Sequence, residues 1–296
     1  MKEITTIADR YLFEHFYGNC SAESKCEKNC RGLVLDEGYS WLDVILDGER
    51  ICGECEHRTE WQGFYYEKNK FSEGFGDKEY VTLNKIRTQA EFALVCAKIN
   101  TQVKGIVIRG AVEDASPLEY FGALEFVVFE GQRMARLWDM SKNPYLRMLT
   151  LWMNKNLKSL NGIENAANLE CLQFYTLFSD VALHKIESLA PISALGKLKE
   201  LIVTATEPAD HNIDYLVDLP SLEYLWISPN LFPTECYAKF EAKRFKLSEE
   251  YGIYCEDGGD IYPFGKGKRV MHTADQRQRY LNEYNAFIQK YKNEIV

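Results

Sequence analysis

Five of the nine cysteines lie within the first 55 residues, and they carry the strongest indication of chemistry in this sequence. Clustered thiols in a reducing compartment more often hold a metal or react than form disulfides. Structural zinc needs four thiolate or imidazole ligands, and a CxxC pair lets two thiolates reach one ion without strain. The two groups are Cys20-x₅-Cys26-x₃-Cys30 and Cys52-Gly-Glu-Cys55-Glu-His57. We predict a structural zinc ion held by Cys26, Cys30, Cys52 and Cys55, with Cys20 and His57 as alternative ligands.

The elements around these cysteines favour that interpretation. Leu42, Val44 and Leu46 alternate as in a strand, and Asp47-Gly48 is a preferred hairpin turn, so Cys52 and Cys55 follow a predicted hairpin. A bound ion would stabilise residues 1–80, which have only short apolar runs. Three alternatives remain: thiols packed as small hydrophobic side chains, an iron–sulfur cluster, and a redox-active pair.

A repeat of apolar residues follows this region. Leu146–Asn154 matches the pattern LxxLxLxxN at every required position, and five other segments match its apolar skeleton. Their first residues are separated by 21, 22, 23, 29 and 24 positions, in or at the edge of the range of roughly 20–29 expected for such repeats. The five segments are Val103/Ile106/Ile108, Leu124/Val127/Phe129, Leu169/Leu172/Phe174, Leu198/Leu201/Val203 and Leu222/Leu225/Ile227.

The connecting segments have a period of three. Apolar residues recur every third position from Ile186 to Leu201 and again from Ile213 to Leu225, which indicates 3₁₀ or short helical turns. Over about residues 103–230 the chain resembles the leucine-rich repeat family, and Ser188–Leu201 is most similar to the short repeats of bacterial internalins. The resemblance implies a curved solenoid with a parallel sheet on its concave side, used to bind proteins. The asparagine typical of the family's turns is clear only at Asn154 and Asn230.

The predicted fold class is therefore α/β, a leucine-rich repeat solenoid with caps at both ends. Thr88–Ile99 is expected to form an N-terminal capping helix. Beyond the repeats we expect helices at Pro233–Ser248 and Ala274–Lys292, the second with a capping box at Thr273 and Gln276, and between them a short strand and a loop. The predicted domains are a cysteine-rich domain at 1–80, the solenoid with its capping helix at 81–232, and a C-terminal cap at 233–296.

Alternation along each strand predicts which side chains face outward from the concave sheet, because the leucines enter the core. Aromatic residues are frequent in the centres of interfaces, so this face is expected to bind a protein partner. The alternative is that a terminal extension folds back over the face. The predicted partner-binding residues are Arg109, Phe126, Glu130, Trp152, Tyr175, Tyr224 and Trp226.

Charge and motif content narrow the function classes. The formal charge of −9 argues against nucleic acid or anionic membrane as a partner, and no apolar run is long enough to predict a membrane span or a secretory signal, so we expect a cytoplasmic protein. No GxSxG, GxxxxGK[ST] or HExxH motif is present, which favours a non-catalytic interaction module. The basic loop Gly265–Arg269 is more typical of a solvated loop than of a phosphate site. The competing hypothesis is a metal- or redox-dependent N-terminal module that the repeats position.

Overall fold

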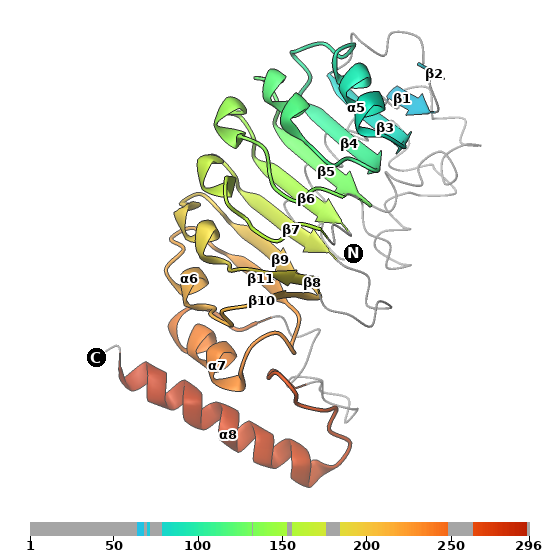
Figure 1. Cartoon of the computed structure of the whole chain (residues 1–296). Helices are drawn as coiled ribbons and strands as arrows, with labels where there is room; N and C mark the ends of the chain where they lie inside the picture. Colours follow the sequence, from blue (N-terminus) through green and yellow to red (C-terminus); the bar gives the residue numbers. More distant parts are fainter. Residues whose placement is uncertain are drawn as a thin grey trace, which may run out of the picture.

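A nine-stranded sheet runs along the molecule (Figure 1). The computed structural model describes residues 64–67, 70–71, 79–131, 133–152, 156–175, 184–247 and 263–294. The strand order is β11-β9-β7-β6-β5-β4-β3-β1-β2, and every pair is parallel except β1 with β2. The strands are β1 (Phe64–Glu67), β2 (Lys70–Phe71), β3 (Tyr80–Ile86), β4 (Gly105–Gly110), β5 (Phe126–Glu130), β6 (Met148–Trp152), β7 (Cys171–Tyr175), β9 (Glu200–Val203) and β11 (Tyr224–Ile227).

The six repeats predicted from the apolar pattern are confirmed as β4, β5, β6, β7, β9 and β11. Their register is regular, because Ile106, Val127, Leu149, Leu172, Leu201 and Leu225 stand side by side across the sheet. Every apolar position of the repeat pattern is buried in one continuous hydrophobic cluster. Each strand therefore supplies one layer of a core that no repeat could bury alone.

Short turns return the chain on the side opposite the sheet, as the three-residue period predicted (Figure 1). They are α5 (Gln89–Cys96), the 3₁₀ segments η4 (Ser116–Tyr120), η5 (Met140–Lys142), η6 (Ile163–Asn165) and η7 (Ala190–Ala194), and α6 (Asp214–Val217). Helix α5 begins as expected, since the Thr88 side chain accepts a hydrogen bond from the Glu91 amide. The buried apolar residues of these turns belong to the same core cluster, whereas Leu94 and Tyr120 are exposed.

One asparagine links neighbouring turns, but it is not one that the sequence singled out. The buried side chain of Asn143 donates to the carbonyl oxygens of Leu118 and Phe121, at 2.9 and 3.0 Å, and accepts from the Trp138 indole at 2.7 Å. Both carbonyl oxygens also accept a backbone amide, from Phe121 and from Leu124, so Asn143 gives each of them a second donor and ties its own turn to the preceding one. Asn230 is exposed, and Asn154 lies outside the described residues.

Strand β3 is a part of the sheet that the sequence analysis missed. It pairs with β4 in the same register as the later repeats, so α5 lies between two strands of the solenoid. Its pattern is hard to recognise because the register shifts between Leu83 and Ile86, and Lys85 there has a φ of 59°. The irregular end breaks the alternation on which strand prediction depends.

Two further strands lie beside the main sheet. β8 (His184–Ile186) and β10 (Thr206–Pro208) form a separate parallel pair, in which Lys185 stands opposite Glu207. β8 lies within the long interval between β7 and β9, where the sequence has its 29-residue spacing, and η7 follows it before β9. The extra residues of that repeat therefore add part of a second, smaller sheet.

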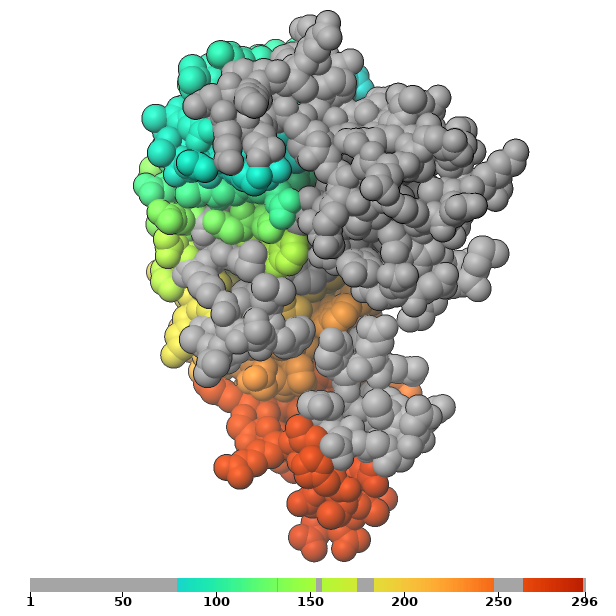
Figure 2. Space-filling model, turned by 90° about the vertical axis from the view of Figure 1, so that its right-hand side faces the viewer, coloured from blue at the N-terminus to red at the C-terminus, as the bar shows by residue number. Residues whose placement is uncertain are grey.

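Helices α7 (Thr234–Lys243) and α8 (Ala274–Asn293) close the end of the solenoid, as predicted, and α8 has the predicted capping box (Figures 1 and 2). Tyr237 of α7 is fully buried and its hydroxyl donates to the Ser228 carbonyl oxygen at 2.6 Å. Arg244 donates to the carbonyl oxygens of Leu219 and Leu222, the last turn before β11. The cap thus covers the final apolar layer and binds its backbone. The predicted strand Tyr251–Glu256 lies outside the described residues.

None of the helices in the described part of the chain has the length and apolar composition that crossing a bilayer requires.

Candidate binding surface

The concave face of the sheet carries the side chains that alternate with the core leucines. Successive strands place them in cross-strand rows, because the pairing keeps one register from β4 to β7. The first row begins Gly105, Phe126, Met148, and the row at the carboxyl ends is Arg109, Glu130, Trp152 and Tyr175. The sequence rule therefore assigned these residues to the correct face.

Phe126 is nevertheless buried, and the expectation that it is exposed is wrong. A Cβ added to Gly105 would lie 2.0 Å from the tip of the Phe126 ring, so the ring fills the space above this glycine. Beyond Gly105 the ring stacks on Tyr80, with a distance of 5.8 Å between centroids. We assign Phe126 to packing along the sheet. The sequence analysis could not foresee this contact because it did not predict β3.

The middle of the face holds a buried polar network. The Thr150 hydroxyl donates to Oε1 of Gln173 at 3.0 Å, and Nε2 of Gln173 donates to Oε1 of Glu200 at 2.8 Å. The Cys171 thiol donates to the same oxygen of Glu200 at 3.4 Å. All four residues are at most 4% exposed. Because buried polar groups need partners, these contacts fix the orientation of the Gln173 amide and the Glu200 carboxylate.

Exposure on this face is therefore restricted to a few described positions. Val107, Val128, Met148 and Ile202 are at most 1% exposed, although they lie outside the main core cluster. The partly exposed side chains belong to Arg109, Glu130, Trp152, Tyr224 and Trp226. The prediction of a continuous exposed face is wrong for the middle of the sheet. Five of the seven predicted partner-binding residues keep accessible side chains.

Three of these five form one row at the carboxyl ends of β4, β5 and β6. Arg109 stands opposite Glu130, which stands opposite Trp152. Nε of Arg109 lies 2.5 Å from Oε2 of Glu130, and the two side chains are 28% and 15% exposed. The ion pair is held between neighbouring strands, so it presents a fixed charge pattern beside an indole ring.

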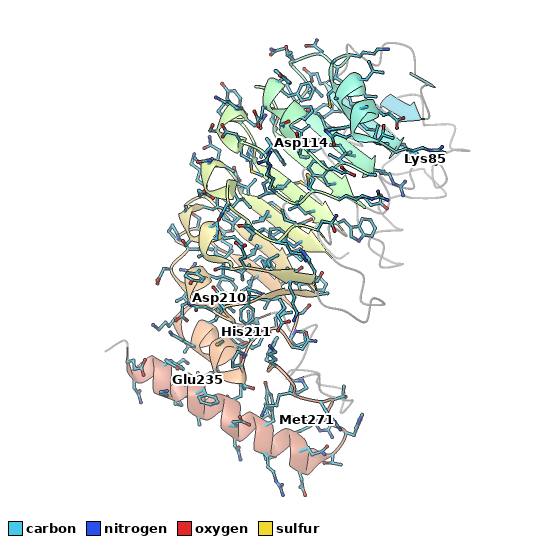
Figure 3. All side chains as sticks on the ribbon, in the orientation of Figure 1. Lys85, Asp114, Asp210, His211, Glu235 and Met271 are labelled. Atoms are coloured by element: carbon cyan, nitrogen blue, oxygen red, sulfur yellow. The ribbon has the colours of Figure 1, made fainter. Side chains whose placement is uncertain are left out.

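The chain turns sharply at Gly110, directly after Arg109 of this row. Gly110 follows Arg109 with a φ of 137°, and an added Cβ there would lie 2.0 Å from the Ile86 carbonyl oxygen. That oxygen accepts the Ala111 amide at 2.8 Å. In Figure 3, Lys85, which precedes Ile86, lies at the same carboxyl edge of the sheet. A glycine at position 110 thus permits the close approach of two backbones that positions Arg109.

The other two accessible residues lie on β11, where Tyr224 and Trp226 stand opposite Glu200 and Ile202. The backbone of Tyr175 continues the row of Trp152 on β7, and its side chain lies outside the described set. The accessible part of the concave face therefore has an Arg–Glu–Trp row near one end and a Tyr–Trp pair at the other.

The predicted zinc ligands Cys26, Cys30, Cys52 and Cys55 lie outside the described residues, as do Cys20 and His57, so the zinc site stays a prediction. Within the described ranges, no group of three or more His, Cys, Asp or Glu side chains is arranged to hold a metal ion. Of the cysteines described there, Cys96 and Cys236 are free thiols, and Cys171 belongs to the polar network with Glu200. Burial raises the pKa of the Cys96 thiol, which makes it unreactive near neutral pH.

The basic loop at Gly265–Arg269 joins the cap to the solenoid. Lys266 lies 2.5 Å from Glu207 of β10, and a hydrogen bond from Lys266 holds the pKa of that carboxyl below its ordinary value. Lys268 pairs with Glu283 of α8 at 2.9 Å. His211, shown beside Asp210 in Figure 3, lies within 3.7 Å of Glu207. These lysine contacts favour a structural clasp over a phosphate site.

No protein-family model and no curated protein matches this chain. Among solved structures, the chain is similar to the crystal structure of an internalin (inlF) from Listeria monocytogenes. The two are 20% identical, the TM-score is 0.47, and the alignment covers 57% of this chain and 46% of that one. The aligned part thus spans less than half of the internalin chain. The strand register and the core described above are those of a solenoid like that of leucine-rich repeat proteins.

Proposed function

We propose that this chain is a non-catalytic protein-interaction module, which recognises a protein partner through the accessible residues of the concave face. The observation that carries the proposal is the row of Arg109, Glu130 and Trp152 at the carboxyl ends of adjacent strands. A tryptophan beside an arginine is the composition typical of energetic centres in interfaces. The rigid strands fix the spacing of these side chains, which limits the entropy lost on binding.

The chemistry of the row indicates what kind of partner it fits. The indole of Trp152 offers a flat apolar surface, and the Arg109–Glu130 pair beside it offers both a hydrogen-bond donor and an acceptor. A protein segment with an apolar side chain flanked by polar groups would match it. Tyr224 and Trp226 on β11 would contact a more distant part of the same partner. Free thiols at Cys96 and Cys236 support a reducing compartment, so we place this function in the cytoplasm.

Affinity capture with matched variants tests the proposal. Three tagged proteins are each incubated with lysate of the source cells: the parent, Trp152→Ala and Tyr145→Ala. The proteins captured by each are quantified by mass spectrometry. Tyr145 is the control because it is 63% exposed and lies in the turn before β6. We expect Trp152→Ala to lower recovery of the specific partner at least about tenfold, the loss typical of an interface centre, and Tyr145→Ala to leave it unchanged. Equal recovery with Trp152→Ala and the parent would overturn the proposal.

The predicted zinc site is tested separately by elemental analysis of the purified protein together with free-thiol counting before and after denaturation. One zinc per chain with about four protected thiols is expected for tetrahedral thiolate ligation. All nine thiols free without metal would remove the site, and iron in place of zinc would support the competing hypothesis of a working N-terminal module.

A further inference from the structure

In the main sheet, the residue immediately before each of the strands β3, β4, β5, β6, β7, β9 and β11 is charged, and its sign alternates from one strand to the next. We call this row the edge ladder. Its seven members in order across the sheet are Glu79, Lys104, Glu125, Arg147, Glu170, Lys199 and Glu223. The alternation continues across the long interval between β7 and β9, so it follows the order of the strands and not a fixed spacing in the sequence.

The backbone holds these residues side by side. The carbonyl oxygen of each ladder residue accepts two amides from the next strand's entry: Glu79 accepts from Lys104 and Gly105, at 2.7 and 3.1 Å. The same pair of bonds recurs at each of the next five junctions, with distances of 2.7 to 3.2 Å. We call each of the seven residues a rung. The backbones of adjacent rungs are therefore one strand spacing apart, about 4.8 Å, and those of rungs with like charge are about twice that distance apart.

Side chains of adjacent rungs form ion pairs. Lys104 pairs with Glu79 at 2.9 Å, and Glu170 receives Arg147 on one side at 2.8 Å and Lys199 on the other at 2.9 Å. Partial burial raises the pKa of the Glu170 carboxyl, but hydrogen bonds from Lys199 and Arg147 outweigh this and hold its pKa below the ordinary value. The hydrogen bond with Glu79 raises the pKa of Lys104. Adjacent rungs thus stabilise each other's charges.

Exposed ion pairs contribute little to the stability of the fold, so stability alone does not explain why the sign of the charge alternates across all seven strands. The apolar skeleton is nearly the same in every repeat, so the core alone discriminates poorly between a strand's correct neighbour and a similar strand. Pairing a strand with the next but one would bring Glu beside Glu or Lys beside Arg. Pairing a strand with its counterpart from a second copy would also bring like charges together.

We propose that the edge ladder is a pairing-specificity device, which disfavours skipped repeats and the pairing of a strand with its counterpart from a second copy while the solenoid folds. Misassembly of this kind is a characteristic failure of repeat proteins, and like charges at a wrong junction oppose it at little cost to the native state.

Two variants test the proposal. The swap variant, Lys104→Glu with Glu125→Lys, keeps the composition and net charge but places like charges side by side at positions 79/104 and 125/147. The inverted variant reverses the sign of all seven rungs, with Lys at the four acidic positions and Glu at the three basic ones, and so keeps every neighbouring pair opposite. Each protein is unfolded in urea, refolded by rapid dilution, and measured by size-exclusion chromatography with light scattering.

In about 10 mM salt the screening length is about 30 Å, so like charges on neighbouring strands repel each other strongly. We expect the fraction of the swap variant that refolds to the parent's size to be at least twofold lower than that of the parent protein, and the rest to form oligomers. In 1 M salt, where screening acts over about 3 Å, its yield should approach that of the parent. The inverted variant should refold like the parent in both salts. Parental yield of the swap variant in low salt would overturn the proposal, and so would an inverted variant that misassembles as much as the swap variant.

Two further variants, at Arg147, distinguish mispairing of the strands from a simple loss of stability. Arg147→Gln removes a ladder charge without creating a like-charged neighbour. It should regain the parent's size in low salt, whereas Arg147→Glu, which gives three adjacent carboxylates, should form oligomers. Equal refolding of these two variants would also overturn the proposal.

Discussion

Along the amino ends of the strands every repeat contributes a charge opposite to that of its neighbours, whereas along the carboxyl ends one ion pair, Arg109 with Glu130, is followed by Trp152. Both edges are built on the same repeat frame and the same strand register. At the amino edge the side chains are matched to one another within the chain. At the carboxyl edge the ion pair lies beside Trp152, whose side chain is partly exposed.

Under the two proposals above, one repeat frame carries assembly at one edge of the sheet and recognition at the other. Charges that pair only with adjacent strands specify the order of the repeats, and they need no outside partner. A row that ends in a partly exposed tryptophan has apolar surface whose burial would favour association. Changes at one edge are therefore expected to leave the role of the other edge intact.

The largest expected loss of stability comes from a substitution that disturbs the backbone conformation at Gly110, at the carboxyl edge of the sheet. Gly110 has a φ of 137°, a backbone conformation that alanine rarely adopts. The added Cβ of Gly110→Ala would also lie 2.0 Å from the Ile86 carbonyl oxygen. We expect the free energy of unfolding to fall by about 2–3 kcal/mol in urea denaturation. The control is Gly122→Ala, where no atom lies within 4 Å of the added Cβ, so the change should be within about 0.5 kcal/mol. Equal losses in the two variants would show that the close approach at Gly110 is unimportant.

A smaller effect is expected from removing one cation at each edge. Arg109→Met leaves Glu130, whose side chain is 15% exposed, without its close partner, and should cost about 1 kcal/mol. Lys104→Met affects a pair whose side chains are 36% and 58% exposed, and should cost no more than about 0.5 kcal/mol. Chemical denaturation of both variants measures the difference. A larger loss for Lys104→Met than for Arg109→Met would reverse the comparison between the edges.

The smallest effect is the pH dependence of the edge ladder. The pKa of Glu170 is lowered in the folded chain from its ordinary value of 4.5, so its ion pairs stabilise the fold above pH 4.5 and this stabilisation is lost as the pH falls below it. At pH 7 Glu170→Gln should be less stable than the parent by several tenths of a kcal/mol. The difference should shrink steadily as the pH falls below 4.5. A difference that stays constant down to about pH 2.5 would contradict a role for the carboxylate charge.

The repeat region could be predicted from sequence because its structure is dictated by local patterns. The LxxLxL spacing located six strands, and the period of three located two of the turns opposite them, η7 and α6. The capping box at Thr273 also identified the start of α8. In each case the signal lies within a short stretch of chain, so no knowledge of distant contacts is needed.

Contacts between distant segments could not be predicted in this way. The sequence assigned Phe126 to the exposed face, but its ring lies over Gly105 and against Tyr80, on a strand with an irregular end. The clasp between Glu207 and Lys266 joins residues 59 positions apart in the chain. The α7–α8 contact is similar: Glu235, labelled in Figure 3, accepts hydrogen bonds from Lys290 and Tyr291. Such pairs become neighbours only after the chain has folded.

Site-specific photo-crosslinking tests the central claim, that the carboxyl edge recognises a partner and the amino edge does not. Benzoylphenylalanine is incorporated singly at positions 109, 226 and 147, and crosslinked products are identified by mass spectrometry. Positions 109 and 226 lie on the concave face and position 147 belongs to the edge ladder. We expect the same partner protein to be crosslinked from 109 and 226 and not from 147. Crosslinking of that partner from 147 alone, or of no protein from 109 and 226, would contradict the account.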